Sequence, residues 1–411
     1  IFLIPLIIWY LTTKFSWNQI LNSPVSKQFL PLVALLILIL ASSVFGRAPI
    51  NSFTEGFKFG FLILIIPTFF ELSKYKNPFW FISAIAIGQS ISALHTVCES
   101  AFPSVFTKFF LGEVTEAGQL AIMTPLLFGI ALYLLIVKQN SDWFKSVSIQ
   151  GIRGAVLFIA LGLFAFHKSF NSSNEYIAIF SAIILGFCSW SVITGFRSLL
   201  ENPLEIGLKL LCSTVFPLIA AALLINLKRG PWLGVFCSLC ILVILYERRL
   251  LVLMLISFLA AWLIDPIQQR LTDSYAHFMI AGGRGEIWEI GAELLLKYPI
   301  GIGYENSPLL RSFSQQIPPQ LTHFHSNFIN IGVELGWLGL FIYCWWIFET
   351  CKFLFKNLNQ KLSPGIAISA ALFSWHVAGL VEYNFGDSEV VILAFILVGL
   401  LPQALKTSNN D

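Results

Sequence analysis

The sequence predicts an all-α polytopic membrane protein with about 12 transmembrane helices and one long external loop. Composition is the first observation behind this prediction: 57% of the 411 residues are hydrophobic and 11% are charged, whereas soluble domains carry about 25% charged residues. The second is arrangement, because the apolar residues form continuous runs that approach the ~20 residues needed to cross a bilayer. Continuous apolarity favours helices over a barrel, since a helix satisfies its own backbone hydrogen bonds in lipid.

The apolar runs define twelve or thirteen predicted spans. The shorter runs need support from neighbouring helices to cross. The first run begins at Ile1 rather than Met, so we expect a span that lacks its start. It shows neither the basic start nor the cleavage site of a signal peptide, so a span is favoured over a signal peptide. The predicted spans are 1–12, 29–46, 56–72, 78–96, 117–138, 153–168, 176–195, 206–227, 231–246, 248–264, 328–349, 365–382 and 389–405.

One long polar stretch, residues 265–327, interrupts the apolar pattern. The chain is therefore predicted to contain N-terminal transmembrane helices at 1–264, a loop with amphipathic helices at 265–327, and C-terminal transmembrane helices at 328–411. Because nearly all other residues lie in apolar runs, we expect the polar chemistry of the protein in this loop and in the short turns on the same side.

The distribution of Lys and Arg predicts the orientation. Cytoplasmic loops are enriched in both residues, and an external 265–327 loop puts most basic residues of the short loops on the cytoplasmic side. The loop is therefore predicted to be external, which means periplasmic in a Gram-negative cell. The residues assigned to the cytoplasmic side are Lys14, Lys27, Lys74, Lys76, Lys138, Lys145, Arg153, Arg197, Arg248, Arg249, Lys352, Lys356 and Lys361.

Neither charge nor cysteine usage indicates another class of partner. The net charge of +3 predicts no nucleic-acid binding, because the basic residues are spread over loops that follow the topology rule. Most of the seven cysteines lie inside predicted spans. Cys237 and Cys240 form a CxxC on adjacent turns of an apolar helix, where packing is favoured over a redox or zinc site.

Some cations lie in short turns on the external side, against the charge rule. Arg47 lies in a turn between two spans, and Lys228 and Arg229 form a very short turn before Pro231. An arginine that reaches up to a headgroup phosphate explains such a placement. An anion site explains it equally well, since Pro231 opens the next helix and a helix N-terminus attracts anions. Lys228 and Arg229 are therefore candidate anion contacts, and Arg47 is a candidate from topology alone.

Arg284 precedes an amphipathic helix pattern that Tyr298 and Pro299 end. Apolar residues fall on one face of the pattern and Glu286, Glu289 and Glu293 on the other. A cation in the first turn opposes the helix dipole unless an anion is bound there, so a functional role for Arg284 is favoured over a routine surface role. The following Gly301 and Gly303 predict a tight turn.

His323 and His325 end the polar stretch at the entry to a predicted span. An interfacial histidine is often only an anchor, but two histidines beside external cations favour chemistry, and an imidazole can take a proton from a hydroxyl at neutral pH. Glu382 and Asp387 lie in an external turn without Lys or Arg. They leave a His–carboxylate metal site open, although no established ligand spacing supports it. The favoured roles are orienting the histidine or the arginines, or binding a sugar.

These motifs, in this order, resemble the O-antigen ligase and O-antigen polymerase superfamily. The resemblance is strong from about residue 228 to 400 and loose before that. Each motif is short, whereas their order around one external loop is specific. The residues that carry it are Lys228–Gly234, Gly283–Trp288, Tyr298–Gly303, His323–Asn327, Gly332–Gly339 and Gly379–Glu389.

The resemblance implies a GT-C-type membrane glycosyltransferase of the bacterial inner membrane with its active site on the periplasmic face. Such enzymes transfer a glycan from undecaprenyl diphosphate to an acceptor sugar hydroxyl, and they are understood to need no nucleotide sugar, metal or other cofactor. Carried over to this sequence, Arg229 and Arg284 bind the diphosphate and His325 is the histidine at the end of the loop. His323, Lys228, Arg47, Glu382 and Asp387 are then expected to bind substrate.

The acceptor is not evident from the sequence. A ligase attaches the glycan to lipid A-core, whereas a polymerase joins it to another lipid-linked repeat; the single late loop and the Glu382–Glu389 ending favour the ligase. An anion transporter is the alternative of another class, because intramembrane cations suit an anion pathway. Internal repeats with broken helices are typical of transporters, and we find none in the sequence. A scaffold without chemistry does not explain why Arg229, Arg284 and His325 share one side.

Overall fold

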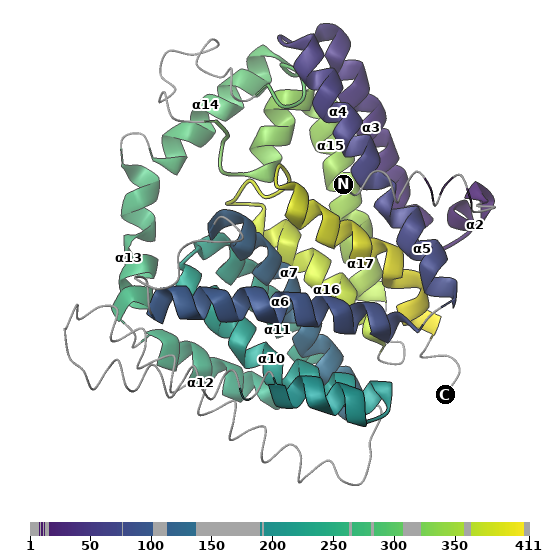
Figure 1. Ribbon diagram of the computed structural model, residues 1–411. Coiled ribbons are helices and arrows are strands. Elements are labelled where there is room, and N and C mark those ends of the chain that lie inside the picture. Colours follow the sequence, from purple (N-terminus) through teal and green to yellow (C-terminus); the bar gives the residue numbers. More distant parts are fainter. Residues whose placement is uncertain are drawn as a thin grey trace. The chain divides into compact units, whose positions relative to one another are not determined.

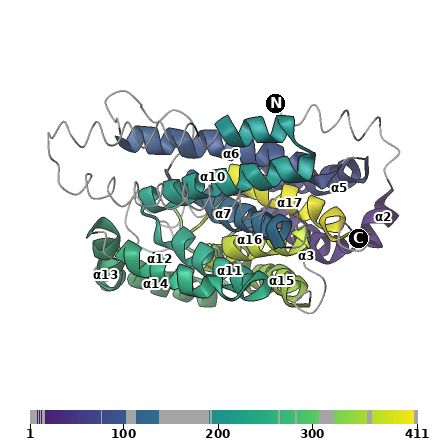
Figure 2. The same cartoon turned by 90° about the horizontal axis from the view of Figure 1, so that it is seen from below.

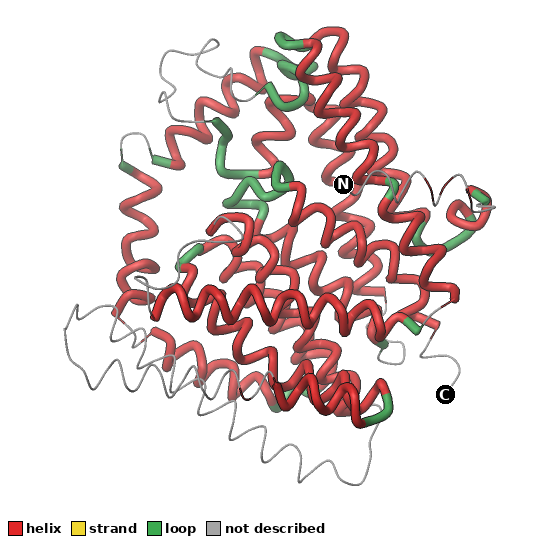
Figure 3. The backbone as a smooth tube through the Cα atoms, in the orientation of Figure 1, coloured by secondary structure: helices red, strands yellow, loops and turns green. Residues whose placement is uncertain are grey.

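The protein is described here by a computed structural model. It covers residues 8, 10, 12, 16–75, 77–101, 113–136, 190, 193–262, 265–280, 283–306, 322–356 and 363–406. These residues form α-helices joined by short loops, and no β-strand occurs among them (Figure 3). The predicted all-α fold class is confirmed for this part of the chain.

Seven helical segments among the described residues are long and apolar enough to cross a membrane. Three shorter apolar helices, Leu250–Leu259, Pro364–Ala378 and Ser388–Ala404, accompany them. The predicted spans 153–168 and most of 1–12 and 176–195 lie outside the described residues. The chain is a multi-pass membrane protein, while the number of about 12 spans stays a prediction. The seven segments are Ser26–Phe45, Pro49–Lys74, Pro78–Glu99, Thr115–Ile136, Leu204–Asn226, Arg229–Tyr246 and Asn327–Phe355.

The helices divide into two compact units, each built from separate stretches of chain. The first unit comprises Ile1–Lys76, Asp273–Lys356 and Gly379–Lys406. In it α3 packs on α4 and α15, α17 on α5, and α14 on α15 (Figure 1). Its core is aromatic, with Phe385 in ring contact with Phe59, Tyr343 and Trp346. Its helices are α2 (Trp17–Leu21), α3 (Ser26–Phe45), α4 (Pro49–Ile63), α5 (Ile65–Tyr75), α14 (Arg284–Lys297), α15 (Asn327–Lys356) and α17 (Ser388–Lys406).

The second unit comprises Asn77–Thr272, Asn357–Ala378 and Thr407–Asp411. Its helix α7 packs on α6, α10, α11 and α16, and these helices lie side by side in both views (Figure 2). Small residues allow this close packing, since a Cβ on Gly129 would lie 2.6 Å from that of Ala367. Its helices are α6 (Pro78–Ala101), α7 (Glu113–Ile136), α10 (Leu204–Asn226), α11 (Arg229–Tyr246), α12 (Leu250–Trp262) and α16 (Pro364–Ala378), and α13 (Asp265–Met279) begins in it.

The described part of the polar stretch is ordered as helices and a glycine turn. The amphipathic pattern forms α14, which buries Ile287, Ile290, Leu294 and Leu295 as the sequence predicts. The glycine turn is also confirmed, because Gly301 and Gly303 have φ of 95° and 106°. The predicted division into 1–264, 265–327 and 328–411 refers to the position of each segment relative to the membrane, not to which helices pack together. It stays a prediction.

Two of the differences between the helices and the sequence-based expectation bear on the candidate site. The predicted span 365–382 ends earlier, because α16 stops at Ala378 and residues 379–387 form a turn. The helix α15 contains a non-helical residue, Gly336, with φ 70° and ψ −167°. A Cβ on Gly336 would lie 2.2 Å from the carbonyl oxygen of Pro299, so the glycine turn after α14 packs directly against this break. The 379–387 turn and the glycine turn both carry residues of the candidate site.

Candidate active site

The histidine segment is anchored by the residue between the two histidines. Phe324 is fully buried, its carbonyl oxygen accepts a hydrogen bond from Trp288 Nε1 at 3.0 Å, and its amide donates to Asn330 Oδ1 at 3.1 Å. His323 and His325 flank this anchor and stay half-buried. The anchor packs among residues of α14, the glycine turn and α15, namely Ile287, Ile290, Leu294, Ile302 and Val333.

His323 and His325 lie against each other. Their ring centroids are 4.4 Å apart with an interplanar angle of 81°, and the backbone N–H of His325 donates to His323 Nδ1 at 3.2 Å. His325 adopts the left-handed conformation with φ 50°, which is uncommon for a residue other than glycine. Burial, with a smaller effect of the neighbouring His325, lowers the pKa of His323 to about 4. His323 is therefore neutral at pH 7.

Asn327 joins the histidine segment to the 379–387 turn. Its side-chain oxygen accepts from the backbone N–H groups of Asn384 and Phe385, both at 3.0 Å, and its Nδ2 donates to Asn384 Oδ1 at 2.7 Å. Its backbone N–H donates to Gly379 O at 2.8 Å. The side chain is fully buried, where unmet hydrogen-bonding groups are costly. The turn is thereby held beside the histidines.

Arg284 is the first residue of α14 and binds the same turn. Its Nη1 donates to Val381 O at 2.6 Å, and its Nη2 donates to Glu382 Oε1 at 3.0 Å. Within the described residues these two contacts use two of the five N–H groups of the guanidinium. Glu382 supplies the anion that a cation at a helix N-terminus requires. Arg284 and Glu382 both influence the pKa of His323, so these groups belong to one polar site.

Tyr383, the next residue of the turn, lies on the histidine side. Its ring centroid is 5.4 Å from that of His323, and its hydroxyl donates to Glu305 Oε1 at 3.3 Å. Glu305 also adopts a left-handed conformation, with φ 54°. Burial raises the pKa of the Glu305 carboxyl and that of the Tyr383 hydroxyl, so Tyr383 stays a neutral donor. Neither Tyr383 nor Glu305 was predicted from the sequence to be part of the site.

The structure does not bring Arg47 to Arg284. The Arg47 guanidinium lies 5.9 Å from the ring centroid of Tyr298, which directly follows α14, whereas Arg284 opens that helix. The 14 residues of α14 separate the two ends by roughly 20 Å at 1.5 Å per residue. Asp387 directly precedes α17, where its backbone oxygen accepts from the amides of Val390 and Val391.

Lys228 and Arg229 open α11 in the second unit. Lys228 has an extended conformation and Arg229 is the first helical residue, so the helix begins two residues before Pro231, where the sequence predicted its start. The preceding Leu227 is left-handed with φ 56°, and its carbonyl oxygen accepts from Arg270 Nε at 3.2 Å. Arg270, a residue of α13 that the sequence analysis did not single out, therefore holds the backbone directly before Lys228.

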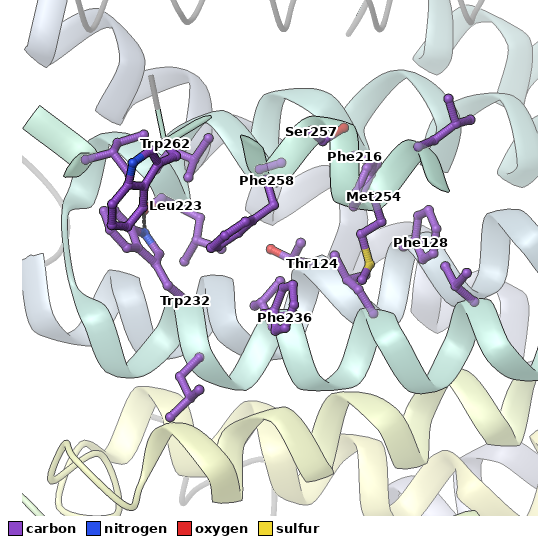
Figure 4. A pocket seen from close by; sticks show the side chains of 18 of the residues that line it. Thr124, Phe128, Phe216, Leu223, Trp232, Phe236, Met254, Ser257, Phe258 and Trp262 are labelled. Atoms are coloured by element: carbon purple, nitrogen blue, oxygen red, sulfur yellow. Dashed lines mark hydrogen bonds between the residues drawn. The ribbon is translucent and has the colours of Figure 1, made fainter. Parts of the chain in front are cut away.

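An apolar cavity of about 600 Å³ lies beside Arg229 within the second unit. Its wall is formed by α7, α10, α11, α12 and α13, and Trp232, Phe236 and Met254 point into it (Figure 4). Arg229 is the one charged residue of the described lining. The Trp232 indole is fixed by its Nε1–H, which donates to Leu223 O at 2.9 Å. A cation at the edge of an apolar cavity is suited to an amphiphile with an anionic head.

Metal ligands do not gather in the described structure. No group of three or more His, Cys, Asp and Glu side chains is arranged to hold a metal ion among the described residues. The first unit brings together Arg284, Glu382, His323 and His325, and it adds Tyr383 and Glu305. The sequence could have indicated Tyr383, because it directly follows the candidate residue Glu382. Glu305 lies 78 residues before Tyr383, and only the preceding glycines distinguish its position in the sequence.

Comparison with known proteins supports the resemblance inferred from the sequence. Residues 214–344 match the Wzy_C family, described as O-Antigen ligase. The matched range contains Arg229, Arg284, His323 and His325, and it ends before Glu382. Two proteins named "Putative polysaccharide ligase" align with most of this chain. The one from Rickettsia typhi is 23% identical over 343 residues, and the one from Rickettsia prowazekii is 23% identical over 345 residues; each alignment covers 79% of this chain and 78% of the relative.

The low pKa of His323 predicts how stability depends on pH. An unfolded histidine titrates near 6.5 and His323 near 4, so between these values the unfolded state binds more protons. This contribution to stability is fully present above pH 6.5 and is lost as the pH falls toward 4. We expect the thermal midpoint in detergent to fall over this range, and to fall less in His323→Asn. An equal fall in both proteins would contradict the prediction.

Proposed function

We propose that this protein is a membrane glycosyltransferase that moves a glycan from undecaprenyl diphosphate to a sugar hydroxyl on lipid A-core, as an O-antigen ligase. The observation that carries the proposal is the cluster of Arg284, His323 and His325, which combines a cation and a candidate base inside the residues that match the O-antigen ligase family. The apolar spans and the relatives named as polysaccharide ligases support it.

The arginines are proposed to bind the diphosphate of the donor. Cleavage of the sugar–phosphate bond leaves negative charge on the diphosphate, and guanidinium groups stabilise that charge through charge-assisted bidentate hydrogen bonds. Arg284 suits this role because Val381 and Glu382 orient its guanidinium while N–H groups remain for phosphate oxygens. Arg229 suits it because it stands at the N-terminus of α11, where a helix favours an anion. Lys228 adds a neighbouring cation.

The cavity beside Arg229 suits the lipid part of such a donor. Its lining is aliphatic and aromatic, with Thr124 and Ser257 among its few polar residues. An isoprenoid chain gains free energy there by leaving water, at roughly 25 cal/mol per Å² of apolar surface. This arrangement favours a lipid-linked donor over a soluble nucleotide sugar.

His325 is proposed to be the general base. In the transfer step a ring nitrogen of His325 takes the proton of the acceptor hydroxyl, and the acceptor oxygen forms a bond to the anomeric carbon of the glycan. The bond between that carbon and the phosphate oxygen breaks, and its electron pair leaves with the diphosphate. Positioning of both substrates supplies a large part of the rate, and proton transfer to a placed base supplies typically 10²–10⁴-fold.

The remaining assignments follow from the same proposal. Glu382 orients Arg284, and Asp387 and Arg47 stay predicted substrate contacts. By its resemblance the enzyme has a GT-C-type architecture, lies in the bacterial inner membrane with the site on the periplasmic face, and works without metal or another cofactor. The partners are the undecaprenyl-diphosphate-linked glycan, lipid A-core and the bilayer.

A reaction with purified components tests the function. We expect purified protein to transfer glycan from undecaprenyl diphosphate to lipid A-core with equal yield in the presence and absence of EDTA, measured as product by gel mobility and mass spectrometry. Product formed only with a second lipid-linked repeat would show a polymerase instead. Loss of activity in EDTA, restored by magnesium, would contradict the metal-independent mechanism. Anion uptake into vesicles without glycan transfer would show a transporter.

Removal of either arginine tests the diphosphate site. We expect Arg284→Ala and Arg229→Ala each to abolish transfer while expression and detergent stability persist, because each removes a guanidinium from the leaving group. Lysine should restore little activity, since it supplies a point charge without the planar fork. Arg249→Ala, at a side chain that is 91% exposed, is the matched control. Full transfer by either alanine variant would remove that arginine from the site.

Removal of the His325 imidazole tests the base. We expect His325→Ala to lower turnover by roughly 10²–10⁴-fold with little change in donor affinity, because the arginines hold the charge of the donor. The acid limb of the pH–rate profile should disappear in this variant. If His325 were only an interfacial anchor, His325→Gln and His325→Tyr would retain near-normal turnover, since both side chains form hydrogen bonds at the headgroup level.

A further inference from the structure

His323 is predicted from the sequence to contact substrate, and the structure shows that its ring contacts His325 and Tyr383. Its Nδ1 accepts the backbone N–H of His325 at 3.2 Å, its ring meets the ring of His325 in a T-shaped contact, and its ring also contacts Tyr383. A nitrogen that accepts a backbone N–H does not offer that position to a sugar hydroxyl. We propose that His323 is the positioning residue of His325 and holds the backbone of the base in its left-handed conformation.

The backbone strain of His325 explains why such a residue is needed. Left-handed conformations of residues other than glycine persist only where surrounding contacts enforce them, and they gather at functional sites. Three non-glycine residues with positive φ occur in the described chain: Leu227, Glu305 and His325. In each case a side chain binds a backbone group of the strained residue, namely Arg270 on Leu227 O, Asn51 on Glu305 O and His323 on His325 N. The bond from His325 N–H to His323 is therefore one of three cases in which a side chain holds a left-handed residue by its backbone.

The protonation state of His323 suits this role. Because Nδ1 accepts a hydrogen bond, the proton of the neutral ring is assigned to Nε2. Its lowered pKa keeps the ring neutral and the Nδ1 lone pair present through the neutral range. The nearby charges of Glu382 and Arg284 act on His323 with opposite sign. A protonated His323 would lose the acceptor and place a cation beside the base.

A second layer of contacts holds His323 itself. Tyr383 packs on its ring and donates its hydroxyl to Glu305. Glu305 is fixed in turn by the bond from Asn51 of α4 at 2.8 Å, and the neighbouring Tyr304 O accepts from Ser52 Oγ at 2.9 Å. The glycine turn and α4 therefore support the histidine pair from outside the histidine segment.

An isosteric pair of substitutions tests the proposal, which rests on the proposed function of His325. His323→Asn keeps an acceptor near the Nδ1 position, since asparagine commonly binds the backbone N–H two residues on. His323→Leu has almost the same shape and no acceptor. In the reconstituted transfer reaction we expect His323→Asn to retain turnover within a few-fold. We expect His323→Leu to lose about 10–100-fold in kcat, the loss typical of a small misplacement of a catalytic group, with little change in the KM of either substrate.

A double-mutant cycle separates positioning from stability. In a His325→Ala background the His323→Leu substitution should have no further effect, because there is no base left to position. His323→Phe keeps the ring contacts but has no acceptor, so it should resemble His323→Leu and serves if that variant does not fold. Equal loss in Asn and Leu variants, or a raised acceptor KM at unchanged kcat, would overturn the proposal. Normal turnover of His325→Ala would instead overturn the proposed base itself.

Discussion

The site depends on the buried amide of Asn327, which joins two parts of the chain that are far apart in sequence. Its two side-chain atoms satisfy the amides of Asn384 and Phe385 and the side-chain oxygen of Asn384, while its own backbone N–H meets Gly379 O. Because unmet buried groups are costly, this set of bonds fixes the turn against the first residue of α15. The bonds of Arg284 to Val381 and Glu382, and of Tyr383 to Glu305, add to this support and hold the turn beside the histidines.

Glu382 and Tyr383, which are neighbours in this turn, contact different parts of the site. Glu382 reaches Arg284 at the start of α14, and Tyr383 reaches His323 and Glu305. One short turn thus aligns the proposed diphosphate contact with the proposed base. Rigid helices provide the supports, because α14 and α15 pack on each other and Phe324 is buried between their apolar residues. The histidines and Glu382 lie in loops between these helices, as is common for functional residues that a stable scaffold holds.

Features with a local physical signal could be predicted from the sequence. The apolar period of α14 and the turn at Gly301 and Gly303 each depend on residues within one or two helical turns, and the structure confirms both. The cations and histidines stood out because they are rare in an apolar chain. Their roles in catalysis stay predictions.

Other features depend on contacts between distant segments and have no local signal. The break at Gly336 lies inside an apolar stretch and arises because the turn after α14 packs there. The early end of α16 reflects the bonds of Asn327 to the following turn. Arg47 shares a predicted side of the membrane with Arg284 but lies at the other end of α14, which topology cannot reveal. Glu305 and Tyr383 meet only through the folded turn.

The ion pair of Arg284 with Glu382 has a consequence for product release. A guanidinium with no acid beside it would bind the free diphosphate, which carries more negative charge after the sugar has left, more tightly than the donor. Glu382 already contacts Arg284 Nη2 at 3.0 Å, so it repels part of the added charge and keeps the guanidinium paired when the lipid diphosphate departs. If Arg284 binds the diphosphate as proposed, the same carboxylate that orients it also limits product inhibition and keeps the enzyme turning over.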